Sequence, residues 1–149
     1  MKPGQFYWSL VDPIWDAVSI YDGPEVFLEQ IGKVTTLQRH LFAAHWCQSE
    51  VRSGGFHQFF SNDTGVLAPE AVEGFRAIGL EACASALQRA MAFFGPDYPR
   101  KRSLREDLLD ALELSDPENW DPFTEMDDAF FAAIENGALE RAADAYAAG

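Results

Sequence analysis

The sequence predicts an all-α fold, built as one multi-helix domain over residues 1–149. Apolar residues recur at helical spacing through most of the chain, and no segment alternates apolar with polar residues as a strand does. Proline, glycine and capping residues divide this pattern into segments of helix length. With 149 residues, 48% of them apolar, the chain is long enough to bury a single hydrophobic core.

Two prolines and a capping box start the helices in the first third of the chain. Pro13 and Pro24 stand where proline is favoured, in the first turn of a helix. Thr35 and Gln38 have the spacing of a capping box, so a longer helix is expected from there to about Val51. Residues 1–11 precede the first of these signals and are expected to form an irregular lead-in.

Similar signals divide the rest of the chain. Pro69 opens a helix, and Gly79 bends the chain after it. Ser103 and Glu106 have the spacing of a second capping box, and Pro122 starts a further helix. The segment after the bend carries a core stripe at helical spacing, made of Leu80, Cys83, Leu87, Ala90, Met91 and Phe94. We therefore expect helices at about residues 12–22, 24–31, 36–51, 56–61, 67–78, 80–94, 104–114, 122–136 and 138–148.

A tandem glycine followed by several aromatic rings stands out in the middle of the chain. Gly54 and Gly55 allow a sharp turn, because glycine adopts backbone angles that a Cβ forbids. The rings that follow fall on one face of a short helix, which residues 62–65 end with turn-forming side chains. The motif consists of Glu50, Gly54, Gly55, Phe56, Gln58, Phe59, Phe60, Asn62 and Gly65. We interpret it as a corner between two helices that organises the core.

Charge is concentrated at one end of the chain. Residues 1–105 hold 11 acidic and 10 basic residues, a net of −1, and residues 106–149 hold 13 acidic residues against Arg141, a net of −12, which together give the −13 of the whole chain. Such a surface repels nucleic acid and anionic membranes, and it attracts basic partners over a Debye length of about 8–10 Å at physiological salt. A solvated surface that only keeps the protein soluble is the simpler interpretation.

The helix expected over residues 104–114 has two faces. Its apolar residues share one arc and are expected to face the core: Leu104, Leu108, Ala111 and Leu112. Carboxylates form a ridge on the opposite side and continue beyond the helix, and the candidate partner-binding surface consists of Glu106, Asp110, Glu113, Asp116, Glu118, Asp121, Glu125 and Asp128. Asp127 belongs to the same stretch of carboxylates, and the alternative for it is partial burial with a basic or backbone group as its partner.

Several classes of protein do not fit the sequence. No apolar run is long enough to span a bilayer, and residues 1–5 lack the apolar stretch of a secretory signal. Cys47 and Cys83 lie in core-like patterns, which favours free thiols in a reducing cytoplasm over a disulfide framework. The basic cluster from Arg100 to Arg105 is too small for a nucleic-acid footprint. We expect it to pair with the acidic carboxyl-terminal segment or with a dimer mate.

The residues beside the glycine pair have three interpretations. His57 and Gln58 can satisfy buried backbone groups. They can instead belong to a small-molecule pocket lined by Glu50, Gly54, Gly55, His57, Gln58 and Trp46. Cys47 and His57 can also be read as a nucleophile–base pair, although no third group orients them. The histidines lack metal-ligand spacing, and we expect no metal, cofactor or catalytic residue.

Two blocks of the sequence carry a family resemblance. The first is the corner motif with Val51 and the pair Ile78-Gly79, and the second is Met126-Asp127 with Phe130-Phe131. On these residues the chain resembles the bacterial DNA-mimic-protein family, over about residues 12–146. Ser53 departs from the family pattern, which more often has Asn before the glycine pair. Because Asn tolerates left-handed backbone angles better than Ser, this departure bears on the turn type of the corner.

The resemblance implies an all-helical fold, frequent dimerisation and, in the member that names the family, an acidic surface that takes the place of duplex DNA on a DNA-binding protein. The leading hypothesis is a cytoplasmic, non-enzymatic protein, monomeric or homodimeric, whose acidic surface binds a basic protein such as a transcription regulator. Two alternatives stay open. One is a small-molecule-binding or catalytic domain that uses the pocket beside the glycine pair, and the other is an immunity-like protein with a single dedicated partner.

Overall fold

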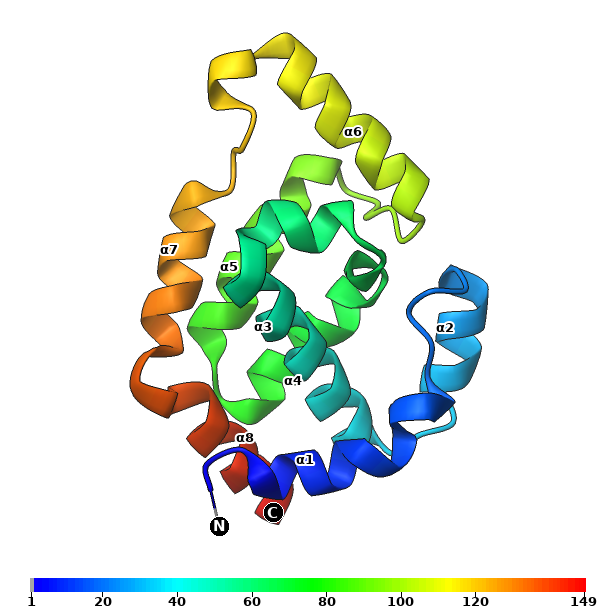
Figure 1. Cartoon of the computed structure of the whole chain (residues 1–149), viewed down its shortest axis with the longest axis vertical. Coiled ribbons are helices and arrows are strands. Elements are labelled where there is room, and N and C mark those ends of the chain that lie inside the picture. Colours follow the sequence, from blue (N-terminus) through cyan, green and yellow to red (C-terminus); the bar gives the residue numbers. More distant parts are fainter. Residues whose placement is uncertain (1) are drawn as a thin grey trace.

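The computed structural model describes residues 2–149, and most of them are helical (Figure 1). Within those residues it has eight α-helices and no β-strand, which confirms the predicted fold class. The α-helices are α1 (Gln5–Val11), α2 (Pro24–Ile31), α3 (Thr36–Ser61), α4 (Ala68–Ile78), α5 (Glu81–Met91), α6 (Arg102–Ser115), α7 (Thr124–Ala133) and α8 (Ala138–Ala148). Short 3₁₀ segments join them: η1 (Asp12–Ala17), η2 (Asp63–Leu67), η3 (Ala92–Phe94), η4 (Pro117–Asn119) and η5 (Glu135–Gly137).

The long helix α3 lies at the centre, and most of the other helices pack around it (Figure 1). It begins with the expected capping box, in which Thr35 Oγ1 accepts a hydrogen bond from the Gln38 amide at 3.1 Å and Gln38 Oε1 accepts one from the Thr35 amide at 3.1 Å. Helix α4 packs against it, and α7 packs on α5 and α3. Phenylalanine rings from these helices and their connections fill the space between them and are fully buried: Phe56, Phe59, Phe60, Phe75, Phe123 and Phe130.

Most helix bounds follow the prediction within a few residues. Helix α2 has the predicted bounds, and the helices expected over residues 36–51 and 56–61 are the two arms of α3 on either side of the glycine pair. Gly79 ends α4 in a left-handed conformation, with φ of 92°. Among the described residues, no helix has the length and apolarity needed to cross a membrane.

The first helix begins earlier than predicted. Residues 5–11 form α1 instead of an irregular lead-in, and the Asp12-Pro13 pair starts only the 3₁₀ segment η1. Gly4 precedes α1 and gives it no side-chain cap. Asp144 of α8 replaces that cap, since its carboxylate accepts hydrogen bonds from the amides of Gly4 at 2.7 Å and Tyr7 at 3.0 Å. The prediction failed because this acceptor is 140 residues away in the sequence.

Helix α6 is rotated relative to its predicted orientation. Leu104 and Leu108, expected in the core, are 50% and 41% exposed, whereas Arg105 is 0% and Leu109 is 4% exposed. The second capping box is also absent, because α6 begins at Arg102 and has no side-chain cap. Glu106 instead accepts a hydrogen bond from Nε of Arg102 at 2.8 Å. The apolar pattern alone did not reveal that an arginine occupies the core side of this helix.

His45 lies in an aromatic cluster beside α1 and η1. Its Nδ1 is 2.9 Å from the Tyr7 hydroxyl, and its ring centroid lies 4.9 Å from that of Trp8 and 5.7 Å from that of Trp15. Burial, and to a lesser extent the positive charge of Arg52, lowers the pKa of His45 to about 4. The imidazole is therefore neutral in the folded protein at neutral pH.

This histidine is expected to make the folded state sensitive to mild acid. The unfolded chain takes up a proton at His45 near its ordinary pKa of about 6.5, whereas the folded chain does so only near pH 4. The contribution of the neutral, buried imidazole to the free energy of unfolding is fully present above about pH 6.5. As the pH falls to about 4, up to about 3 kcal/mol of this free energy is lost. Urea unfolding at several pH values should show a shallower pH dependence for His45→Gln over this window. An identical pH slope in both proteins would contradict the assignment.

Candidate functional site

The glycine pair forms the predicted corner inside α3. Gly54 has φ −156° and ψ 18°, and Gly55 has φ 74° and ψ −176°, so the helix axis breaks between them. The next amide, that of Phe56, donates a hydrogen bond to Oδ1 of Asp127 at 2.8 Å. A Cβ on Gly55 would lie 2.7 Å from Oδ2 of the same carboxylate, so a side chain here meets both backbone strain and a clash. The corner is thus built against α7.

Asp127 follows the second of its two interpretations, that of a partly buried residue with a backbone partner. It lies in the first turn of α7, is partly buried, and pairs with a backbone amide of α3. Burial raises the pKa of its carboxyl, while the hydrogen bond from the Phe56 amide opposes that shift. Asp127 therefore holds α7 against the corner and is not available to the acidic surface.

Glu50 connects the two arms of the corner. Its carboxylate accepts hydrogen bonds from Gln58 Nε2 at 2.8 Å, Asn62 Nδ2 at 3.3 Å and Thr64 Oγ1 at 2.6 Å. Gln58 also lies over Gly54, where a Cβ would come within 2.0 Å of its Oε1. The polar residues of the motif are therefore bonded to one another through their side chains, whereas His57 and Gln58 were expected to satisfy buried backbone groups.

Glu50, Gly54 and Gln58 of the hypothesised small-molecule pocket contact one another, but Trp46 and His57 have other neighbours. Trp46 stacks on Trp15 with ring centroids 5.0 Å apart, whereas His57 packs edge-on against Trp120 at 4.7 Å. His57 lines a cavity of about 280 Å³, but its other walls are Ser61, Glu106, Leu109, Asp110 and Glu113. Burial raises the pKa of the Cys47 thiol well above its usual range, which is the opposite of what a nucleophilic cysteine needs. Among the described residues, no group of three or more potential ligands could hold a metal ion.

The candidate carboxylates lie along α6, η4, the start of α7 and the residues between them, and in Figure 1 α6 and η4 lie at one end of the molecule while α7 runs along its side. We call residues 106–128 the acidic arm. Of the eight candidates in it, four are exposed and have no ion pair or side-chain hydrogen bond within residues 2–149: Asp110, Glu113, Glu118 and Asp128. Asp107, which the sequence analysis did not single out, is exposed and unpaired in the same way.

The other four candidates have partners within the chain. Glu106 pairs with Arg102 at 2.8 Å, and the exposed Glu125 lies 3.6 Å from Arg89. Asp116 and Asp121 accept hydrogen bonds from the Asn119 side chain at 2.9 Å and the Phe123 amide at 3.0 Å. Over residues 106–149, three of the 13 carboxylates form ion pairs with arginine, those of Glu106, Glu125 and Glu140. Most of the negative charge of this segment is therefore not compensated within the chain.

Comparison with protein families matched one family model. The family model described as DMP19-like protein, where DMP19 is DNA mimic protein 19, matches residues 32–148, a range that includes both the corner and the acidic arm. The chain belongs to the DMP19-like protein family. Comparison with curated proteins and with solved structures gave no match. The family match begins later than the resemblance expected from about residue 12, and so leaves out α1, η1 and α2.

The departure at Ser53 has no consequence for the corner of this DMP19-like protein. The positive φ lies at Gly55, and Ser53 keeps a negative φ as the last helical residue before the break. The left-handed conformation that Asn tolerates better is therefore not required at this position.

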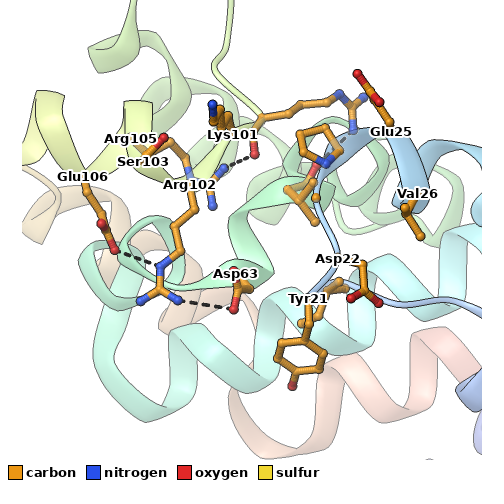
Figure 2. Close-up of a pocket in the computed structure, with 15 residues that line it drawn as sticks. Tyr21, Asp22, Glu25, Val26, Asp63, Lys101, Arg102, Ser103, Arg105 and Glu106 are labelled. Carbon is orange, nitrogen blue, oxygen red and sulfur yellow. Dashed lines mark hydrogen bonds and ion pairs between the residues drawn. The ribbon is translucent and has the colours of Figure 1, made fainter.

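The basic cluster of this DMP19-like protein is bound mainly within the chain. Arg100 makes a bidentate pair with Glu70, at 2.7 and 2.9 Å. Arg102 pairs with Asp63 at 3.2 Å and with Glu106 at 2.8 Å (Figure 2). The expectation of pairing with the acidic carboxyl-terminal segment is thus correct for Arg102 and Glu106 alone, and the other acidic partners come from α4 and η2. Beside these arginines, a cavity of about 760 Å³ opens between the start of α2 and the start of α6 (Figure 2).

Arg105 is a structural residue that the sequence did not reveal. It is fully buried, and its guanidinium donates to the carbonyl oxygens of Phe60 at 2.9 Å, Asn62 at 2.8 Å and Pro99 at 3.2 Å, and also to that of Arg100. Gly65 lies directly against it. Burial lowers the pKa of Arg105, but arginine remains charged at any ordinary pH. This side chain anchors α6, and with it the acidic arm, to the end of α3.

Proposed function

We propose that this chain is a cytoplasmic, non-enzymatic interaction protein whose acidic arm occupies the DNA-binding surface of a basic protein. The uncompensated carboxylates of the arm carry this proposal, and membership of the DMP19-like family supports it. A transcription regulator is the expected kind of partner, since its basic surface is built to neutralise a row of phosphates.

The charge density of the arm limits how much of a duplex one copy can replace. Helix α6 has 14 residues, which span about 21 Å, and it carries four carboxylates, those of Glu106, Asp107, Asp110 and Glu113. That is about one charge per 5 Å, against one per about 1.7 Å along duplex DNA. The whole arm, including η4 and α7, is therefore expected to contact the partner.

Charge reversal on the arm should weaken binding. The double substitution Asp110→Lys, Glu113→Lys replaces two exposed, unpaired carboxylates, and we expect it to lower affinity for a DNA-binding partner by about tenfold or more. Displacement of a labelled duplex from purified DNA-binding proteins, followed by fluorescence anisotropy, measures this effect directly.

A matched control separates the arm from net charge. Asp16→Lys, Asp22→Lys changes the net charge by the same amount at two exposed carboxylates outside the arm. This variant should compete with DNA as the unmodified protein does. Equal losses in the two variants would mean that overall charge, and not the arm, drives binding. Failure to displace DNA from any regulator would contradict the proposed function.

A further inference from the structure

Helix α6 leaves a row of apolar side chains uncovered. Leu104 is 50% exposed and Leu108 is 41% exposed, and Ala111 is exposed one turn further on. Leu114, near the end of the helix, is 83% exposed. A single exposed leucine needs no explanation, but residues at i, i+4 and i+7 form the stripe with which one helix packs on another.

The buried side of α6 explains why this row cannot turn inward. Arg105 and Leu109 face the core, and α6 packs on α3 and η2 through that side. The hydrogen bonds from Arg105 to the carbonyls of Phe60 and Asn62 fix the rotation of the helix. Exposure of the leucines is therefore part of the folded structure.

The charges beside the row indicate what covers it. Residues 107–116 contain four carboxylates, those of Asp107, Asp110, Glu113 and Asp116, and no cationic side chain. Asp107 lies next to the leucines on the exposed side, Asp110 borders that side toward the cavity it lines with His57, and neither forms an ion pair within residues 2–149. A second copy seated here would bring like charges together, and an uncharged helix would desolvate the carboxylates without compensation. A helix with one apolar face flanked by lysine and arginine would cover the leucine row and would also pair with the carboxylates beside it.

We propose that the α6 outer face, made of Leu104, Asp107, Leu108 and Ala111 and bordered by Asp110, binds a basic amphipathic helix of the protein partner. The partner's apolar side chains pack on the leucine row, and its cations pair with the flanking carboxylates. This inference rests on the proposed function and deepens it, because it makes recognition partly apolar where phosphate mimicry alone would make it electrostatic. DNA-reading surfaces also carry apolar side chains beside their arginines, for example against thymine methyl groups.

Two synthetic peptides of equal composition test the apolar contribution. One is a helix of about 18 residues with leucines at i, i+3, i+4 and i+7 and lysine or arginine elsewhere, and the other has the same residues in scrambled order. At about 0.15 M salt, the full-length protein should bind the patterned peptide about tenfold more tightly than the scrambled one. Leu104→Ala, Leu108→Ala should remove this difference and leave the affinity for the scrambled peptide unchanged.

The control variants make the outcomes distinct. Leu28→Ala removes a leucine of α2 that is 43% exposed, and it should change neither affinity. Alanine keeps the helix propensity of α6, and circular dichroism confirms that each variant folds.

If Leu104→Ala, Leu108→Ala has no effect while Asp110→Lys, Glu113→Lys lowers the affinity for both peptides, the inference is wrong and the proposed function stands. If neither peptide binds the unmodified protein, both are wrong. A dimer that Leu104→Ala, Leu108→Ala dissociates in light scattering would assign the face to self-association and overturn the inference.

Discussion

Replacing Arg105 by alanine is expected to lower the free energy of unfolding by about 3–5 kcal/mol. The guanidinium donates to carbonyl oxygens of Phe60, Asn62, Pro99 and Arg100, which belong to the end of α3 and to the loop before α6. Alanine leaves these acceptors in a buried site without donors and also leaves a cavity beside Gly65. Because small domains are stable by about 5–15 kcal/mol, this is a large share of the total. Urea unfolding followed by circular dichroism measures the loss.

Arg102→Ala is the matched control for this prediction. Arg102 lies three residues earlier on the same helix, its side chain is 44% exposed, and its partners Asp63 and Glu106 are also partly exposed. Exposed ion pairs contribute about 0.2–1 kcal/mol, so this variant should be destabilised much less. Equal destabilisation of the two variants would show that burial of the Arg105 guanidinium does not anchor α6.

Gly74→Ala is expected to destabilise the protein by about 3 kcal/mol, although helix propensity alone favours alanine by about 1 kcal/mol. A Cβ at this position would lie 2.5 Å from the carbonyl oxygen of His40, which belongs to the backbone of α3. A helix backbone cannot rotate away as a flexible side chain does, so α3 and α4 must separate and loosen the core between them. Thermal unfolding measures the change.

Whether Gly74→Ala stabilises or destabilises the protein tests the close contact between α3 and α4. Ala77→Gly, at an exposed position of α4, gives the propensity scale for the same helix and should cost about 1 kcal/mol. Without the close approach of α3, Gly74→Ala would stabilise the protein by a similar amount. A neutral or stabilising result would therefore contradict the close approach of Gly74 in α4 to the backbone of α3.

The parts of the fold that depend on local sequence could be predicted, and those that depend on distant partners could not. The capping box of Thr35 and Gln38 involves neighbouring residues only, and the glycine pair itself indicates the turn at Gly54 and Gly55, although not the contact of that turn with Asp127 of α7. Helix α1 depends on Asp144 at the other end of the chain, and its start was missed for that reason. Local pattern therefore gives most helices but not their long-range caps.

The orientation of α6 at the candidate site also depends on distant partners and could not be predicted from local sequence. The apolar pattern predicted that Leu104 and Leu108 lie in the core, because arginine is much less often buried than leucine. Arg105 is buried nonetheless, since carbonyls of residues 60–62 and 99–100 converge on it only in the folded chain. The excess of carboxylates in residues 106–149 was visible from counting alone. Which of them remain unpaired depends on tertiary contacts such as that between Arg89 and Glu125.

Salt dependence of partner capture tests the role of the acidic arm most directly. Immobilised protein and a variant with Asp107, Asp110, Glu113, Glu118 and Asp128 changed to their amides are each exposed to a cell extract at about 0.05 M and about 0.5 M salt. The unmodified protein should retain basic DNA-binding proteins at low salt, release them at high salt or when duplex DNA is added, and retain them better than the amide variant does. Retention of the same proteins at both salt concentrations, or by both forms of the protein, would contradict an electrostatic role for the arm.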